Sequence, residues 1–334
     1  MMSTRGFFIG EFMKKKKVMI VDGTNNFYRS YIVDPSMSTN GAPIGGVKGF
    51  FKTLQKMSRE IKPDHIVVCW DGADGSRKRR TIVKTYKDGR KPIRLNRTDR
   101  VLTENQEKDN KIWQQVRLME YLNETPIMQF VLDSVEADDI ISLVAQDPKY
   151  DGWFKVIVSS DKDFFQLCDD ETIIHRPIQK ETLNKPRVIE QFGIHPKNFA
   201  LARAVAGDKS DNLPGVPGVG LGTLARRFPF LSEDKDYTLQ TLVDACEEVE
   251  KPLKVHQGIL DNQDIISQNY KMMQLYSPLI SIQGKQKIKY VLNNFEFHFN
   301  KTEVDKMMVF DGFGTTNFTD LYALFRRICV DNLA

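Results

Sequence analysis

Acidic side chains gather in two short motifs near the middle of the chain. The first, at residues 135–141, holds three carboxylates and opens an apolar-periodic stretch typical of a helix. The second, at 159–164, holds two carboxylates and directly follows an apolar run. The five acids are Glu136, Asp138, Asp139, Asp161 and Asp163. Acids brought together repel one another, and divalent cations relieve that repulsion, so the motifs raise the hypothesis of a metal centre. Any one of them alone would also fit as a helix-start or turn residue.

The surrounding pattern predicts a sheet that would bring these and other acids together. Continuous apolar runs alternate with helical periodicity as far as about residue 176, which favours a mostly parallel, doubly wound α/β sheet. Strands are expected at 18–21, 65–70, 127–132 and 154–158, and the longest intervening helices at 46–61 and 103–123. Asp22 and Asp71 each follow a predicted strand at once. Because right-handed connections bring the carboxyl ends of parallel strands to one edge, all these acids are expected at that edge.

A strongly basic segment, residues 77–100, follows Asp71. It carries eleven basic and two acidic residues, a net charge of +9, whereas the whole chain carries +4. Such a local excess is the footprint expected for binding a phosphate backbone. A solvated charged loop is the alternative interpretation.

A glycine-rich turn lies further along, at residues 207–220. It holds Asp208 and Asp211, then three glycines, and leads into a predicted helix at 221–228. Glycines permit close approach of a backbone, and amides at a helix start can hold a phosphate oxygen without reading a base. The turn is therefore predicted to bind duplex backbone, although it could also be a plain helical hairpin.

Composition and spacing exclude several other kinds of protein. No apolar run approaches the roughly 20 residues of a membrane span, and the four scattered cysteines favour reduced thiols in a cytoplasmic compartment. The five histidines form no catalytic constellation, and no phosphate-binding Gly-Lys-Ser/Thr loop occurs. Oxygen ligands without Cys/His spacing favour Mg²⁺ or Mn²⁺ over zinc. Residues 1–16 are expected to be a disordered leader, 17–180 the α/β core, and 181–334 a helical region.

Five motifs together resemble the 5′-3′ exonuclease/flap endonuclease family, in particular its bacteriophage and bacterial-polymerase-associated branch, which includes phage ribonuclease H enzymes. They are Asp22-Gly-Thr-Asn, Trp70-Asp71-Gly72, Glu136-Ala-Asp-Asp139, Ser160-Asp161-Lys-Asp163 and the acidic, glycine-rich turn at 207–220. They occur in family order over residues 17–228, whereas the last hundred residues carry no comparable signature. The resemblance implies a PIN-like 5′ nuclease core with a helical arch at about 72–104 and a helix-turn-helix at 207–228.

The resemblance also implies roles for individual residues. Two divalent ions are expected, the first held by Asp22, Asp71, Glu136 and Asp138, the second by Asp161, Asp163 and Asp211, with Asp139 and Asp208 supporting through water. The stretch from Tyr86 to Arg90 resembles the family's Tyr-Lys-x-x-Arg, so Lys87 and Arg90 are expected to contact the scissile phosphate. The glycine-rich turn resembles a module that grips downstream duplex, in some members around a K⁺ ion. The expected DNA contacts are Arg29, Arg77, Arg79, Arg80, Lys84, Tyr86, Gly215, Gly218, Gly220, Arg226 and Arg227.

The expected function is a structure-specific nuclease that removes 5′ flaps, and RNA primers on DNA, in replication and repair. A single-strand-binding protein or sliding clamp is the expected kind of protein partner, and a monomer the expected state. A non-catalytic branched-DNA-binding protein of the same fold is the first alternative, but it would be expected to lack some of the carboxylates. A phosphatase with an aspartate nucleophile is the second, but residues 22–25 lack its Asp-x-Asp.

Overall fold

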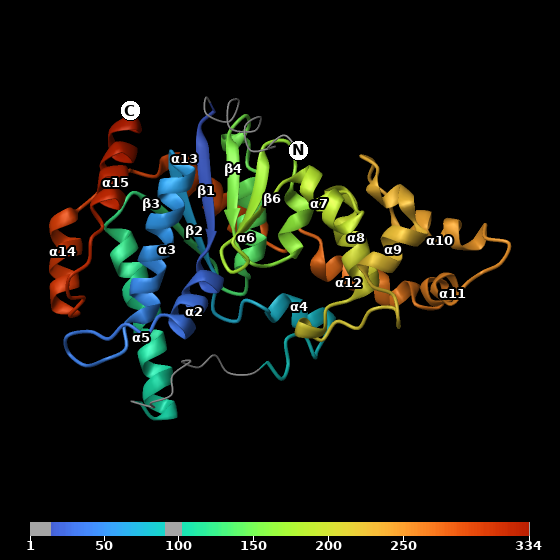
Figure 1. Cartoon of the computed structure of the whole chain (residues 1–334), viewed down its shortest axis with the longest axis horizontal. Coiled ribbons are helices and arrows are strands. Elements are labelled where there is room, and N and C mark those ends of the chain that lie inside the picture. The colour runs from blue at the N-terminus through green and yellow to red at the C-terminus, as the bar shows by residue number, and fades with distance from the viewer. Residues whose placement is uncertain (1–14, 91–101, 334) are drawn as a thin grey trace, which may run out of the picture.

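A central sheet flanked by helices on both faces dominates the computed structural model, which describes residues 15–90 and 102–333 (Figure 1). Helices α2, α3, α5, α14 and α15 lie on one side of the view, and α7 to α12 extend to the other. The arrangement confirms the predicted fold class of a mostly parallel sheet with helices and a helical C-terminal region. The leader predicted at 1–16 falls almost wholly outside the described residues, as do residues 91–101 of the predicted arch.

The sheet has six strands in the order β3-β2-β1-β4-β5-β6. They are β1 (Lys17–Asp22), β2 (His65–Trp70), β3 (Ile127–Val131), β4 (Phe154–Val158), β5 (Thr172–Arg176) and β6 (Glu181–Leu183). Strand β1 pairs in parallel with β2 on one side and β4 on the other, with Asp22 opposite Cys69 and Val21 opposite Val158. The carboxyl ends of these three strands therefore lie level at one edge of the sheet.

Both faces of the sheet are covered by hydrophobic cores. Met19 and Val21 of β1 belong to the core on the α2 and α3 face, whereas Val18 and Ile20 belong to the core on the α6 and α8 face. Successive residues of a strand point to opposite faces, so a strand buried on both must be apolar throughout. This explains why the central strands appear in the sequence as continuous apolar runs.

Strand β6 is not among the predicted strands. It is only three residues long and pairs antiparallel with β5, placing Arg176 opposite Glu181. These two side chains form an ion pair across the edge of the sheet. A strand this short, with only Leu183 buried, has too few residues to show a period.

Helices account for most of the remaining described chain. They are α2 (Gly23–Val33), α3 (Gly45–Ile61), α4 (Arg77–Ile82), α5 (Glu104–Asn123), α6 (Ala137–Ala145), α7 (Lys185–Phe192), α8 (Pro196–Ala206), α9 (Leu221–Arg227), α10 (Leu239–Glu247), α11 (Lys254–Asp261), α12 (Gln263–Met273), α13 (Ile282–Asn294), α14 (Lys301–Phe310) and α15 (Thr319–Asp331), with a short 3-10 helix, η2, at Asp163–Leu167. The last described helix, α15, is amphipathic, and its Leu321, Phe325 and Ile328 are buried in the core beside α3. Within the described ranges, no helix has the length and apolar character needed to cross a bilayer.

Candidate functional site

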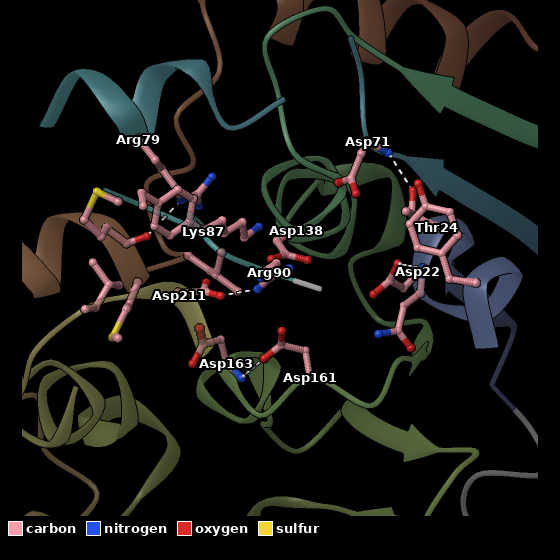
Figure 2. Close-up of a pocket in the computed structure, with 17 residues that line it drawn as sticks. Asp22, Thr24, Asp71, Arg79, Lys87, Arg90, Asp138, Asp161, Asp163 and Asp211 are labelled. Carbon is pink, nitrogen blue, oxygen red and sulfur yellow. Dashed lines mark hydrogen bonds and ion pairs between the residues drawn. The ribbon is translucent and has the colours of Figure 1, made fainter. Parts of the chain in front are cut away.

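Six aspartates line one cavity of about 170 Å³ at the carboxyl edge of the sheet (Figure 2). They are Asp22, Asp71, Asp138, Asp161, Asp163 and Asp211. Lys87 and Arg90 of the basic segment line the same cavity. Acids that are as many as 189 positions apart in the sequence are thus brought together, as the strand pattern predicts.

Asp22 ends β1 and is held at the N-terminus of α2. Its side chain accepts hydrogen bonds from the Asn25 amide at 3.0 Å and from the Ser159 hydroxyl at 2.8 Å. Asp22 is only 5% exposed. Burial is the main reason that the pKa of the Asp22 carboxyl is raised to about 7, with nearby Asp71 adding to the rise.

Asp71 and Asp138 are joined through the start of helix α6. The Asp71 carboxylate accepts a 2.7 Å hydrogen bond from the amide of Ala137, the first residue of α6. Asp138 is the next residue along, so the same helix start fixes both acids. Burial raises the pKa of Asp138 well above its usual range, and the charges of Asp161 and Asp22 raise it further. The site therefore holds more negative charge than its surroundings neutralise.

Asp161 lies in the turn after β4, and Asp163 is the first residue of η2. The Asp163 amide donates to the Asp161 carboxylate at 2.8 Å, which fixes the turn. Arg203 of α8 donates to Asp163 at 2.7 Å and also pairs with Asp208. Arg203 thus contacts two acids at the edge of the site, although it belongs to none of the sequence motifs.

Lys87 and Arg90 each form an ion pair with one of the predicted metal-binding acids. The Lys87 ammonium lies 2.7 Å from Glu136, and Arg90 forms an ion pair with Asp211. Lys87 adopts a left-handed backbone conformation, with φ of 59°, which a lysine rarely takes. Strained backbone held in place by its surroundings is common at functional sites.

Three of the nine acids predicted to hold the metal ions, directly or through water, do not line the cavity. Glu136 accepts from Lys87 and from the Tyr86 hydroxyl, Asp139 pairs with Arg79 at 2.6 Å, and Asp208 pairs with Arg203 and the amide of Ser210. All three carboxylates are therefore already paired with basic side chains or hydrogen-bond donors of the protein. In the described part of the chain, no three His, Cys, Asp or Glu side chains form a ready-made metal-binding group.

Two of the residues predicted to contact DNA are buried instead. Arg79 is 4% exposed and bridges Asp139, Glu136 and the Met272 carbonyl of α12. Tyr86 is also 4% exposed and packs against Leu213 and Met273. Both residues line the cavity, but these contacts fix them in place and leave little of either one exposed. The basic residues Arg77, Arg80, Lys84, Arg226 and Arg227 are exposed, and Arg29 is half-buried.

The glycine-rich turn packs tightly on the end of α8. A Cβ at Gly215 would lie 2.1 Å from the Ala206 carbonyl oxygen, while Gly218 has a positive φ of 75°. Gly220 has no such contact, since a Cβ there would meet open space. Close packing therefore requires glycine at position 215, and backbone conformation favours it at 218.

We expect Gly215→Ala to destabilise the fold by about 1–3 kcal/mol, because the added methyl group must displace the backbone at Ala206. Urea denaturation followed by circular dichroism measures the loss. Gly222→Ala is the matched control, since its Cβ would meet no atom within 4 Å and alanine favours a helix. Equal stability of the two variants would contradict the packing argument.

Several residues that line the cavity belong to none of the sequence motifs. Met272, Met273 and Leu275, at the end of α12 and just beyond it, form an apolar wall together with Leu213. Tyr28 of α2 is another such residue, whereas Thr24 and Asn25 belong to the Asp22-Gly-Thr-Asn motif. The tail that appears motif-poor in sequence therefore contributes one wall of the site.

Residues 17–193 match the family model described as 5′-3′ exonuclease, N-terminal resolvase-like domain. The chain is 33% identical over 215 residues to a 5′-3′ exonuclease of Buchnera aphidicola subsp. Schizaphis graminum, which covers 64% of this chain and 69% of that protein. It is 31% identical over 278 residues to DNA polymerase I of Bacillus subtilis, which covers 81% of this chain and 29% of the polymerase.

Solved structures share the fold. Bacteriophage T5 5′-exonuclease with bound zinc has a TM-score of 0.66 and 18% identity, covering 83% of this chain and 99% of its own. A T5 flap endonuclease complex with DNA and metal ions has a TM-score of 0.62 and 17% identity, covering 88% and 97%. The fold is accordingly the PIN-like 5′ nuclease fold, and the chain belongs to the 5′-3′ exonuclease family.

Proposed function

We propose that this protein is a divalent-metal-dependent nuclease that hydrolyses phosphodiester bonds at 5′ ends, 5′ flaps and RNA primers on DNA. The observation that carries the proposal is the single cavity in which six aspartates meet Lys87 and Arg90. The homologous exonucleases support hydrolysis of nucleic acid from a 5′ end.

The donor set fits a hard divalent cation. The lining acids offer carboxylate oxygens and no thiolate or imidazole, which favours Mg²⁺ or Mn²⁺. Burial, helped by the nearby charge of Asp71, raises the pKa of Asp22 to about 7, so its ionised form is disfavoured there unless a bound cation offsets the charge. We assign Asp22, Asp71 and Asp138 to one ion and Asp161, Asp163 and Asp211 to a second. When bound, such ions activate water and stabilise the leaving oxygen.

The chain's own cations bind and orient the substrate. Lys87, with its side chain 19% exposed, faces the cavity and can offset charge that builds on a cleaved phosphate. The exposed basic residues of the described part of the basic segment would attract the phosphates of a 5′ strand. The glycine-rich turn would hold the backbone of the downstream duplex. The K⁺ ion, the bacteriophage branch and the protein partners named above stay predictions.

Incubation of labelled DNA with the protein tests the function directly. With Mg²⁺ we expect a 5′ flap, a nicked duplex and an RNA–DNA hybrid to be shortened from the 5′ end, and we expect no cleavage in EDTA. Adding Mg²⁺ back should restore cleavage, because the carboxylates alone supply no activated water. Binding of the flap without cleavage under both conditions would instead identify a non-catalytic branched-DNA-binding protein.

A further inference from the structure

Asn212 joins the glycine-rich turn to the segment that presents Lys87. Its side-chain amide donates to the carbonyl oxygen of Asp88 at 2.7 Å and to that of Thr85 at 3.1 Å. These two carbonyls lie on either side of Lys87 in the chain. The two hydrogen bonds link Asn212 to residues 124 and 127 positions earlier in the sequence, and together they hold the backbone around Lys87.

Further contacts join the same two segments. The Lys87 amide donates to the Asp211 carbonyl at 3.0 Å, and the Arg90 guanidinium donates to the Ser210 carbonyl at 3.2 Å. Beneath them, Tyr86 and Leu213 share a small buried cluster with Met272 and Met273. The turn that carries Asp211 and the segment that carries Lys87 are therefore joined by several hydrogen bonds and by apolar packing.

The backbone at Lys87 requires such support. Its φ of 59° lies in the left-handed region, and a residue held there persists only when its surroundings over-determine it. The amide of Asn212 is suited to that task, because one NH₂ group can donate to two carbonyl oxygens. Asn212 itself has a φ of 56°, a conformation that asparagine tolerates better than most residues.

We propose that Asn212 is a positioning residue that keeps Lys87 directed into the aspartate cavity before any substrate arrives. The inference rests on the proposed function for its catalytic consequence, but its structural part concerns the free protein. Asn212 does not line the cavity itself, so it acts through Lys87.

Hydrogen exchange of the metal-free, DNA-free protein tests the structural part. In Asn212→Gly, which permits the positive φ and removes only the side chain, we expect amides in residues 83–90 to exchange about fivefold to thirtyfold faster, as the loss of one or two net hydrogen bonds implies. Asn262→Gly is the matched control, because Asn262 also donates its amide to a backbone carbonyl, that of Gly258. Unchanged protection at 83–90 in Asn212→Gly would overturn the proposal.

Cleavage of a 5′ flap in Mg²⁺ tests the catalytic part. We expect Asn212→Gly to lower kcat about tenfold with KM changed less than about twofold, which corresponds to loss of a single positioning interaction. Asn212→Asp should behave alike, since its carboxylate would face two carbonyl oxygens without a proton to donate.

A double-mutant cycle separates positioning from general damage. If Asn212 acts through Lys87, Asn212→Gly should have little further effect in a Lys87→Ala background. Effects that multiply would overturn the proposal. Should the wild-type protein cleave none of the substrates, the proposed function fails, and the exchange experiment still decides whether Asn212 holds residues 83–90.

Discussion

Asp138→Asn is expected to lower flap cleavage by about 10³-fold or more while leaving duplex binding largely intact. Metal ions supply several kcal/mol of transition-state stabilisation, and each 1.36 kcal/mol is a factor of ten in rate. Asp138 lies at the start of α6 and lines the cavity together with Asp22 and Asp161. Replacing one carboxylate oxygen by an amide group therefore removes a ligand and a charge without changing the shape of the side chain. Single-turnover cleavage in Mg²⁺ and filter binding in EDTA measure the two quantities separately.

The same substitution should not weaken the metal-free fold. Burial and the charges of Asp161 and Asp22 oppose ionisation of Asp138, so its carboxylate costs stability where no cation offsets it. The neutral asparagine removes that repulsion, and we expect the unfolding midpoint in EDTA to stay equal or rise. Asp133→Asn is the matched control, since Asp133 is an exposed acid near the same sheet edge and does not line the cavity. Full activity of Asp138→Asn, or a tenfold loss in the control, would contradict the assignment.

The acids at the strand ends could be predicted because two local signals coincide there. An apolar run marks each buried strand, and an acidic motif begins at its end, as with Asp22 at the end of β1 and Asp161 just after β4. Parallel pairing then aligns the ends, which needs no detailed knowledge of packing. The order and direction of the strands are enough to place these acids at one edge of the sheet, so their positions could be predicted from the sequence.

The cations could not be assigned in the same way. A charge count treats every basic residue of the segment alike, yet Arg79 is buried against Asp139 while Arg80 is exposed. Arg203 reaches Asp163 only because α8 packs beside η2 with that side chain turned toward the turn. Such choices depend on the rotational phase of a helix against distant elements, which no local pattern specifies.

The apolar wall of the cavity is a second example. Met272 and Met273 end α12, far from every motif, and they meet Tyr86 and Leu213 only in the folded chain. Two consecutive methionines at the end of a helix are typical of a plain core, so the sequence offers no signal for a site. None of the family motifs covers α12 either, because they end near residue 228.

Lys87→Ala is expected to lower kcat by about 10²–10³-fold with KM changed less than about threefold. Removal of one group that stabilises developing charge typically has this effect. The Lys87 ammonium, 2.7 Å from Glu136 and directed into the aspartate cavity, is well placed to meet a phosphate bound there. Burial alone would lower the pKa of Lys87, but Glu136, Asp138 and Asp211 together outweigh that effect and raise the pKa above its ordinary value. The ammonium therefore stays charged. Steady-state kinetics on a 5′ flap measure the split between kcat and KM.

Lys84→Ala provides the informative contrast for Lys87→Ala. Lys84 belongs to the same segment but is exposed and does not line the cavity. Its removal should weaken substrate binding and reduce the salt dependence of binding, with kcat unchanged, as expected for a contact to phosphate backbone alone. Lys87→Arg should recover only part of the activity, because the planar guanidinium cannot occupy the position of a compact ammonium. If Lys87→Ala instead raised KM and left kcat intact, Lys87 would be a binding residue, and catalysis would rest on the carboxylates and their ions alone.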